Sequence, residues 1–461
     1  MVKKHLEKIV GAPANALDKT VNISENLVRQ TGVNSSVNKA RKYWHNLGPG
    51  LTTGASDDDP SGIATYSQAG AAYGFQLLWM APFTFPLMSI VQEMCARIGL
   101  VTGRGLAGNI RIHFPKWVLY TTTGLLFFAN TLNIGADIGA MAKSTQLVFP
   151  EVSFATLILA FAIISLALQI YVSYEKYARY LKYLALILFA YIASAILVGL
   201  DYRQLLSASI IPSINFSKEQ IFIICAVLGT TISPYLFFWQ TSQEVEESIL
   251  KGQTTVKLRQ GEVSDNEIKL MRQDVWSGMF ISNLVMFFII AACAATLFKS
   301  GITNIPTVAE AAAALRPIAG EQAYLLFSLG IIGTGMLAIP VLAGSASYAM
   351  SESFGWKHGL YRKLKEANAF YGIIIISTFL GVAMNFIGID PIKALLLAAV
   401  VNGLVAPVIL ILIILLSSNK KLMGARVNHP VITMLGLIIT NIMILAGILT
   451  IIFSFPFSSF F

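Results

Sequence analysis

Long apolar runs constrain this chain more than any other feature. Crossing a bilayer as a helix takes about 20 mainly apolar residues. Nine segments meet that length, at 75–100, 117–145, 152–172, 180–200, 275–298, 323–351, 369–389, 392–416 and 431–454. Only 12% of the residues are charged, about half the usual share of a soluble domain. The sequence therefore predicts an all-α integral membrane protein and excludes an ordinary soluble enzyme.

Two further segments, 47–73 and 220–249, are apolar but interrupted by polar residues. Topology decides whether they also cross, because Lys and Arg gather in cytoplasmic loops. If all eleven segments span and the N-terminus is inside, 27 of the 33 Lys and Arg residues fall on the inner side and five on the outer side. We therefore predict 11 transmembrane helices in the cell (plasma or inner) membrane, with a cytoplasmic N-terminus and an extracytoplasmic C-terminus.

The two interrupted segments each hold a proline near mid-depth, Pro60 and Pro234, beside Gly, Ser and Thr. Proline breaks a helix, and the freed backbone groups are tolerated at this depth only when buried in protein or lining a watery cavity. Breaks in spans 1 and 6 are typical of inverted-repeat transporters, which bind substrate at the breaks. The expected parts are a cytoplasmic tail (1–46), repeat one with helices 1–5 (47–200), repeat two with helices 6–10 (201–416), and helix 11 with the C-terminus (417–461).

The first break carries three adjacent carboxylates, Asp57, Asp58 and Asp59, just before Pro60. One Asp at the bilayer centre costs about 2.5–3.5 kcal/mol on insertion scales. A surface loop with a polar helix cap is one interpretation. The other is a cation site, because the half-helix that ends here points its negative dipole end and free carbonyls at a bound ion. We expect one carboxylate to bind the ion and the other two to be solvated, hydrogen-bonded or protonated.

The second break, residues 229–235, reads Gly-Thr-Thr-Ile-Ser-Pro-Tyr. It offers hydroxyl and carbonyl oxygens but no thiolate, thioether or imidazole. Oxygen ligands suit hard ions such as Mg²⁺, Ca²⁺ and Mn²⁺. Taken alone, this segment is equally a helix kink softened by Ser and Thr. Paired with the acidic break, it predicts the second half of a cation site.

Four other polar residues lie at or near membrane depth. Asp137 and Lys143 in span 3 are functional candidates by default, although a structural polar contact remains open. Asn402 in span 10 makes either a packing hydrogen bond or a contact near the site. Glu244, with the glutamates that follow it, forms either a solvated helix end or an electrostatic vestibule for a leaving cation. No nucleophile–base pair or clustered Cys and His motif indicates an enzyme, and no cofactor is expected.

Several motifs resemble the Nramp (natural resistance-associated macrophage protein) divalent-metal transporters. Span 1 of that family is similar to Gly-Pro-Gly at 48–50, Asp-Pro at 59–60, Gln-Ala-Gly at 68–70 and Leu-Leu-Trp at 77–79. Its span 2 and the following loop are similar to Arg-Ile-Gly at 97–99, Thr-Gly-Arg at 102–104 and Leu-Ala at 106–107. The resemblance implies an amino-acid-transporter type fold, an inverted 5+5 repeat with broken helices 1 and 6 plus helix 11. It also implies alternating access and metal coordination at both breaks.

The chain departs from the family pattern at the positions that touch metal or protons. Where the family has Asp-Pro-Gly-Asn, the ligand Asn becomes Gly62. Where the family has Met-Pro-His, the Met becomes Ser233 and the His becomes Tyr235. The family's span-3 Glu falls on Ala140, and its span-10 Gln falls on Ala399.

Carrying the family's ligands over residue by residue gives a candidate set. The candidate metal ligands are the Ser56 carbonyl, Asp59, the Thr230 carbonyl and Ser233, with Gly62 at the place of the lost Asn. The candidate surrounding or vestibule residues are Asp57, Asp58, Tyr235, Asn402, Asp137 and Glu244.

These departures resemble the Nramp-related magnesium transporters, a divergent branch. Methionine sulfur favours softer metals over Mg²⁺, and its loss leaves room for the waters that Mg²⁺ usually keeps. We therefore expect a transporter of Mg²⁺, and also of Mn²⁺, without strict proton coupling. The alternatives are a proton-coupled Mn²⁺/Fe²⁺ importer and, in another class, an organic-solute symporter. The expected partners are divalent cations and the lipid bilayer, with no nucleic acid, and the expected state is a monomer.

Overall fold

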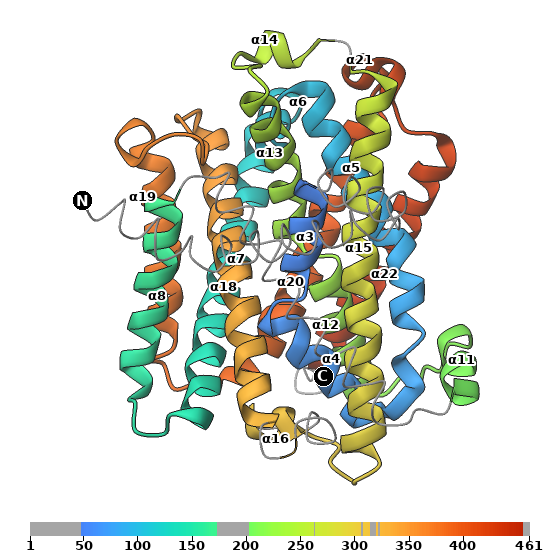
Figure 1. Ribbon diagram of the computed structural model, residues 1–461. Helices are drawn as coiled ribbons and strands as arrows, with labels where there is room; N and C mark the ends of the chain where they lie inside the picture. Colours follow the sequence, from blue (N-terminus) through green and yellow to red (C-terminus); the bar gives the residue numbers. More distant parts are fainter. Residues whose placement is uncertain are drawn as a thin grey trace, which may run out of the picture.

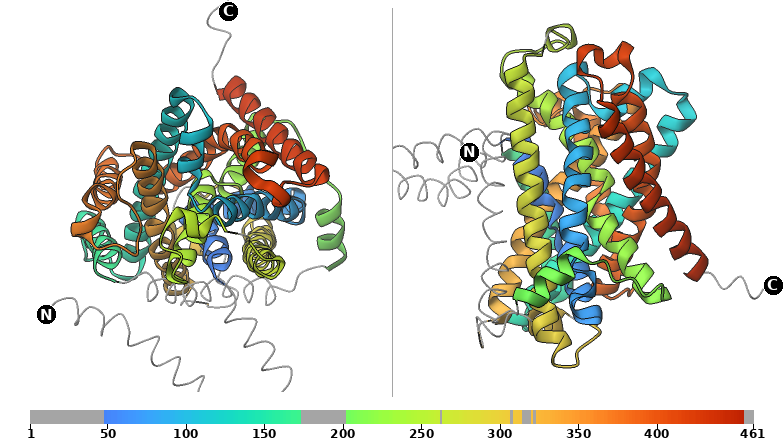
Figure 2. Two further views of the ribbon diagram at one scale, coloured as in Figure 1. Left: turned by 90° about the horizontal axis from the view of Figure 1, so that it is seen from above. Right: turned by 90° about the vertical axis from the view of Figure 1, so that its right-hand side faces the viewer.

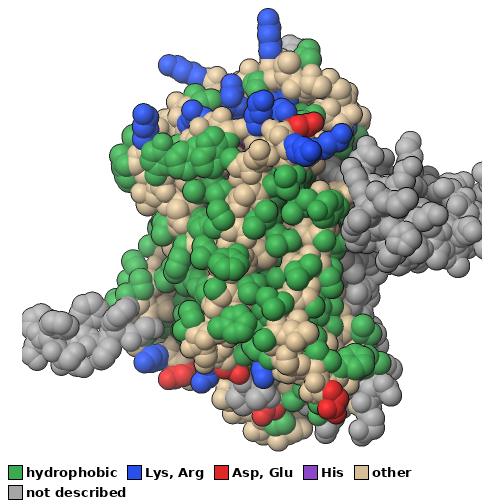
Figure 3. Space-filling view, turned by 90° about the vertical axis from the view of Figure 1, so that its left-hand side faces the viewer, with side chains coloured by type: hydrophobic (Ala, Val, Ile, Leu, Met, Phe, Trp, Pro, Cys, Tyr) green, Lys and Arg blue, Asp and Glu red, His purple; other side chains and the backbone are tan. Residues whose placement is uncertain are grey.

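The computed structural model describes residues 48–172, 202–261, 263–305, 308–313, 320 and 323–454. Within these ranges every regular element is a helix, and the long helices run roughly side by side as one bundle (Figure 1). A belt of hydrophobic side chains covers the middle of the face drawn in Figure 3. The all-α membrane class is therefore confirmed for the described part of the chain.

Helices occupy ten of the eleven predicted spans, and the span at 180–200 lies outside the described residues. The spanning helices are α3 (Pro49–Asp57) with α4 (Pro60–Tyr73), α5 (Met80–Thr102), α7 (Lys116–Val148), α8 (Phe154–Tyr171), α12 (Lys218–Thr231) with α13 (Pro234–Leu250), α15 (Asp265–Cys293), α18 (Ala323–Phe354), α19 (Asn368–Met384), α20 (Pro391–Ser417) and α22 (Pro430–Ser454). The shorter helices are α6 (Leu106–His113), α11 (Tyr202–Ile210), α14 (Val256–Arg259), α16 (Val308–Ala313) and α21 (Lys420–Met423). The exact number of spans stays a prediction.

Proline sets both predicted breaks, which the structure confirms. Pro60 opens α4 and Pro234 opens α13, where the missing backbone N–H is not needed. In Figure 1, α3 lies above α4 whereas α12 lies below α13, so the chain runs in opposite directions through the two broken spans. This is the arrangement expected of an inverted repeat, and it brings the breaks to mid-height. Helix α22 packs outside the repeats, against α20 and α5 (Figure 2).

Glycines hold the broken helices against their neighbours. A Cβ built on Gly54 in α3 would lie 2.3 Å from the Gly278 carbonyl oxygen in α15. A Cβ built on Gly229 in α12 would lie 2.0 Å from the Ala399 carbonyl oxygen in α20. Membrane helices pack through small residues because lipid supplies little hydrophobic drive for helix association. The two half-site helices are therefore fixed against α15 and α20 by backbone contact.

Basic side chains gather at one end of the bundle. Figure 3 shows Lys and Arg concentrated at the end that carries α6, α14 and α21 in Figure 1, with few at the opposite end. At that same half of the molecule, Asp274 of α15 accepts the backbone N–H groups of Gly48, Gly50 and Leu51 at 2.8, 2.7 and 3.1 Å. A carboxylate at a helix N-terminus satisfies donors that lack intrahelical partners. The start of α3 is thereby anchored on α15.

Candidate metal site

The two helix breaks lie against each other. The Tyr235 hydroxyl of α13 donates to the Ser56 carbonyl of α3 at 2.7 Å. From the other side, the Tyr66 hydroxyl of α4 lies 3.2 Å from Thr231 Oγ1 and 3.3 Å from Thr230 Oγ1 of α12. All five residues are buried. Each half of one broken span therefore touches a half of the other, as the sequence predicts.

Asp59 occupies the junction as the N-cap of α4. Its Oδ1 accepts the Gly62 N–H at 2.7 Å, a typical capping bond. Its Oδ2 accepts the Asn133 Nδ2 of α7 at 2.6 Å. The residue is only 2% exposed. One donor on each oxygen fixes the carboxylate in position between α4 and α7.

The two preceding carboxylates are also buried. Asp57 Oδ2 accepts the Ser282 hydroxyl of α15 at 2.7 Å. Among the described residues, Asp57 Oδ1 and both oxygens of Asp58 have no hydrogen-bond partner. Buried carboxylate oxygens without donors are costly. Acceptor atoms of this kind suit a site that receives a cation.

Asp137 and Asn402 are placed inside the protein, whereas Lys143 is not. Asp137 of α7 is fully buried near Asp59, and neither of its oxygens has a hydrogen-bond partner in the described ranges. Asn402 of α20 is buried, and its Oδ1 likewise has no partner there. Lys143 is exposed, with its Nζ 5.0 Å from the ring centre of Phe154. Of the two ionisable candidates in span 3, Asp137 is thus the one that lies beside the breaks.

The candidate ligands of the second break already make hydrogen bonds. Ser233 Oγ lies 2.6 Å from the carbonyl oxygens of both Gly229 and Thr230. A hydroxyl that donates its proton to a carbonyl keeps its lone pairs, and a carbonyl oxygen has two. The Thr230 carbonyl, the Ser233 hydroxyl and the Ser56 carbonyl therefore each retain an acceptor lone pair. Oxygen ligation at this break is compatible with the bonds present.

Gly62 lies close to Asp59 at a tightly packed point. A Cβ at this position would lie 3.2 Å from the Asp57 carbonyl oxygen, 3.3 Å from Tyr66 Cε2 and 3.5 Å from Asp59 Oδ1. Position 62 therefore faces the carboxylate, and a side chain there would project among the candidate ligands. Gly62 itself contributes only its backbone N–H to Asp59.

Three residues at the breaks were missed by sequence reasoning: Asn133, Ser282 and Tyr66. Asn130, Asn133 and Asp137 recur every three or four residues, which places them on one face of α7. That polar stripe within an apolar span is a signal the sequence carries. Ser282 carries no such signal, because a lone Ser is ordinary in a membrane helix.

Glu244 and Glu246 of α13 are buried, whereas Glu247 is partly exposed. Glu244 accepts the Gln240 Nε2 at 3.0 Å. Glu246 accepts the Tyr348 hydroxyl and the Leu360 backbone N–H, the latter at 2.9 Å. The interpretation of a solvated helix end is therefore wrong for Glu244 and Glu246, whereas the vestibule stays a prediction.

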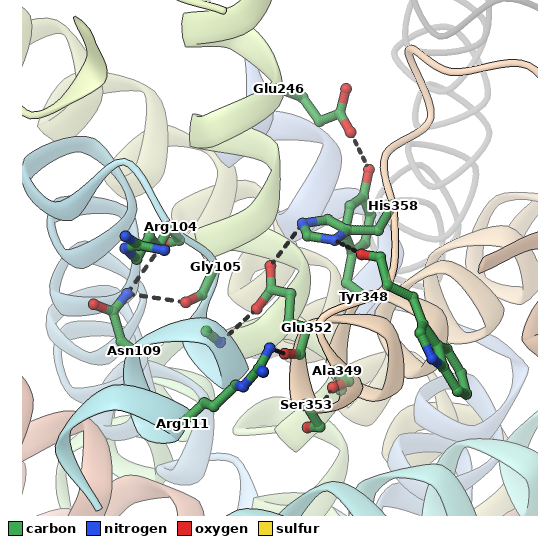
Figure 4. Close-up of polar contacts among 12 residues, drawn as sticks. Arg104, Gly105, Asn109, Arg111, Glu246, Tyr348, Ala349, Glu352, Ser353 and His358 are labelled. Carbon is green, nitrogen blue, oxygen red and sulfur yellow. Dashed lines mark hydrogen bonds and ion pairs between the residues drawn. The ribbon is translucent and has the colours of Figure 1, made fainter. Parts of the chain in front are cut away.

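A polar cluster surrounds Glu352 of α18, and Glu246 of α13 lies at its edge, bonded to Tyr348 (Figure 4). Glu352 of α18 accepts the Gly108 N–H of α6 at 2.8 Å, and its Oε1 lies 3.7 Å from His358 Nε2. The Arg111 guanidinium donates to the Glu352 carbonyl at 3.3 Å. These contacts join α13, α6 and the loop after α18, and they do not reach either break.

The described residues contain no cluster of three or more His, Cys, Asp or Glu side chains arranged to hold a metal. The breaks instead bring buried aspartates together with carbonyl and hydroxyl oxygens. Mg²⁺ is usually bound through one or two carboxylates and several waters.

Comparisons with known proteins agree with this architecture. The chain is similar to a manganese transporter of Eremococcus coleocola, solved with an aromatic bis-isothiourea substituted compound, at TM-score 0.70 and 17% identity over 89% of this chain and 87% of that one. MhsT in complex with L-phenylalanine gives TM-score 0.52 and 13% identity over 87% of this chain and 96% of that one. Mhp1, a nucleobase-cation-symport-1 family transporter, gives TM-score 0.50 and 14% identity over 89% of this chain and 94% of that one.

These structural neighbours share the inverted-repeat fold, so the predicted fold class is confirmed. In addition, residues 50–453 match the family described as natural resistance-associated macrophage protein-like. That match covers spans 1 to 11 as the sequence predicts them, including both breaks. The chain therefore belongs to the natural resistance-associated macrophage protein-like family.

Proposed function

We propose that this protein moves Mg²⁺ across the membrane by alternating access, with Mn²⁺ as a second substrate and without strict proton coupling. Members of the family are membrane transporters of divalent metals and not enzymes, and the metal is their substrate rather than a cofactor. The multi-pass membrane character and the divalent-metal class therefore follow from the family. The preferred ion, the coupling and the ligand set are the proposal.

One observation carries the proposal: the two breaks meet around Asp59, with oxygen at every candidate ligand position. Asp59, the Ser56 and Thr230 carbonyls and the Ser233 hydroxyl supply hard ligands. Hard cations prefer such atoms, and Mg²⁺ in particular keeps part of its water shell. Met286 Sδ of α15 accepts the Thr231 hydroxyl at 3.7 Å.

The orientation in the membrane is part of the proposal. The end with α6, α14 and α21 carries most of the visible Lys and Arg (Figure 3), which favours the cytoplasmic side for that end. The N-terminus would then be cytoplasmic and the C-terminus extracytoplasmic. We also propose a monomer as the transporting unit, because both half-sites come from one chain.

The organic-solute alternative is disfavoured by the charge at the breaks. Transporters that bind a substrate carboxylate point helix N-termini at it. Here Asp57, Asp58 and Asp59 are buried at the same place. Their negative charge would repel the carboxylate of an organic substrate.

Uptake into liposomes tests the proposal. The full chain is reconstituted, and the entry of Mg²⁺, Mn²⁺ and a mixture of amino acids is measured separately. We expect Mg²⁺ and Mn²⁺ to enter, amino acids to stay outside, and Asp59→Ala to abolish cation entry. Asp265→Ala is the matched control, because that side chain is 93% exposed and lies at the start of α15.

Two results would overturn the proposal. Entry of Mn²⁺ or Fe²⁺ without measurable Mg²⁺ entry would favour the proton-coupled importer. Entry of an amino acid that survives Asp59→Ala would favour the symporter.

A further inference from the structure

Asn133 approaches the Asp59 carboxylate from α7. Its Nδ2 lies 2.6 Å from Asp59 Oδ2, whereas Gly62 occupies Oδ1 of the same carboxylate. Asn133 is fully buried, and within the described ranges its own Oδ1 has no hydrogen-bond partner. A buried amide oxygen without a donor is costly. The amide nitrogen therefore bonds to the central carboxylate, whereas the amide oxygen beside it is unused.

We propose that Asn133 is an amide ligand of the transported cation. Without the ion, its NH₂ group donates to Asp59; with an ion on Asp59 Oδ2, the amide turns over and presents Oδ1 to the ion. This inference rests on the proposed function, in which Asp59 binds the cation. The turn exchanges two atoms of nearly equal size in the same plane, so no neighbour has to move. A cation on Oδ2 repels the positive end of the amide and attracts the oxygen.

The amide would replace the one that is missing at position 62. A side chain at 62 would reach the ion from the Oδ1 side, where a Cβ lies 3.5 Å from that oxygen. Asn133 reaches it from the Oδ2 side. The ligand chemistry is kept while the ligand moves from the broken helix α4 to the continuous helix α7. An ion held by both residues would join the broken span to α7, which packs along α18 and α20.

A different role for Asn133 is to hold Asp59 in place by donating a hydrogen bond. Two variants separate the roles. Asn133→Leu removes both donor and acceptor at similar volume. Asn133→Asp keeps an oxygen at the same place but, when ionised, cannot donate. A ligand role predicts loss of ion affinity in the Leu variant only, whereas a donor role predicts equal loss in both.

Ion binding to the full chain in detergent tests the inference, by calorimetry with Mg²⁺ and Mn²⁺ and by the rise in melting temperature that each ion causes. We expect Asn133→Leu to weaken Mg²⁺ binding about tenfold and to reduce the melting shift, with Asn133→Asp within about threefold of wild type. Asn130→Leu is the control: Asn130 lies one turn away on α7, is equally buried, and donates to the Leu342 carbonyl at 2.9 Å. The ion affinity of the Asn130→Leu variant should equal that of wild type.

A second amide offers a rescue. Gly62→Asn in the Asn133→Leu background should restore affinity in part, because position 62 faces the same carboxylate. If Asn133→Leu does not fold, Asn133→Ala gives the same measurement, since it also removes both the donor and the amide oxygen and adds no other polar atom.

The outcomes distinguish this inference from the proposed function. Wild-type affinity in Asn133→Leu, or equal loss in the Leu and Asp variants, overturns the ligand role while Asp59→Ala still abolishes binding. Wild-type affinity in Asp59→Ala overturns the proposed function itself.

Discussion

Asp59 differs from its two neighbours in what its oxygens contact. Both of its oxygens accept donors, from the backbone of α4 and from Asn133 of α7. Asp57 has one donor, and Asp58 has none among the described residues. The sequence predicts that one of the three carboxylates binds the ion, and the family motif selects Asp59. The sequence could not predict which side chains donate to these carboxylates. Asn133 and Ser282 come from other helices, and packing sets how those helices are rotated about their axes.

The three carboxylates should respond differently to substitution. We expect Asp59→Ala to abolish cation transport, and Asp57→Ala and Asp58→Ala to reduce it less. Losing the cap of α4 costs only about 1 kcal/mol, so the Asp59 variant should still fold. Cation uptake by proteoliposomes, with melting temperature as the folding control, measures this. Near-normal uptake by the Asp59 variant would remove Asp59 from the ligand set.

Ser233 decides selectivity in our proposal. We expect Ser233→Met to shift preference from Mg²⁺ towards Mn²⁺ and Cd²⁺, because it exchanges a hard oxygen for a soft sulfur and fills water space. A tenfold change in relative affinity corresponds to about 1.4 kcal/mol, a reasonable size for one ligand. Competition of Cd²⁺ against Mg²⁺ uptake measures the shift. An unchanged Cd²⁺ to Mg²⁺ preference would mean that Ser233 does not face the ion.

At the scale of elements, the helix breaks were the most predictable feature. Pro60 and Pro234 stand beside Gly, Ser and Thr in the two polar segments, and this combination predicts the breaks between α3 and α4 and between α12 and α13. Proline alone does not decide, because Pro86, Pro340 and Pro407 lie inside the continuous helices α5, α18 and α20. Burial was harder to predict. The spans are apolar on nearly every face, so periodicity does not tell which face meets protein. The sequence favours a solvated helix end for Glu244 and Glu246, but neighbouring elements cover both side chains.

Glycine contacts between elements give a stability prediction. Gly54→Ala places a methyl group 2.3 Å from the Gly278 carbonyl oxygen, so α3 must move away from α15. We expect a loss of about 1–3 kcal/mol, typical of overpacking. Gly124→Ala in α7 is the control, since a Cβ there meets nothing within 4 Å and should leave stability unchanged or slightly raised. Melting temperature in detergent measures both. Equal melting temperatures would mean that α3 and α15 tolerate the extra methyl.

At the scale of the whole molecule, two patterns in the sequence were informative. The distribution of Lys and Arg required the two polar segments to span, and helices are found at both. Matching breaks in spans 1 and 6 predicted the inverted repeat. The contacts that build the site join residues far apart in the chain, such as Asp57 with Ser282 and Ser56 with Tyr235. No local pattern encodes such pairs. The sequence therefore predicts where the site lies along the chain but not which residues contact one another there.

The final prediction concerns proton movement during transport. We expect cation entry without stoichiometric acidification of the vesicle lumen. The family pattern has a His at position 235, but in this chain the Tyr235 hydroxyl donates to the Ser56 carbonyl. The family pattern has a Glu at position 140, but in this chain Ala140 has no ionisable group.

A pH-sensitive dye enclosed in proteoliposomes, challenged with Mg²⁺ or Mn²⁺, measures this directly. Asp137 is the remaining carboxylate of span 3 and lies beside Asp59, so it is the residue through which coupling could survive. A proton signal that follows metal entry in wild type and disappears in Asp137→Asn would contradict the prediction and identify that route. A flat dye signal during measurable metal entry would mean that the ion gradient and the membrane potential alone drive uptake.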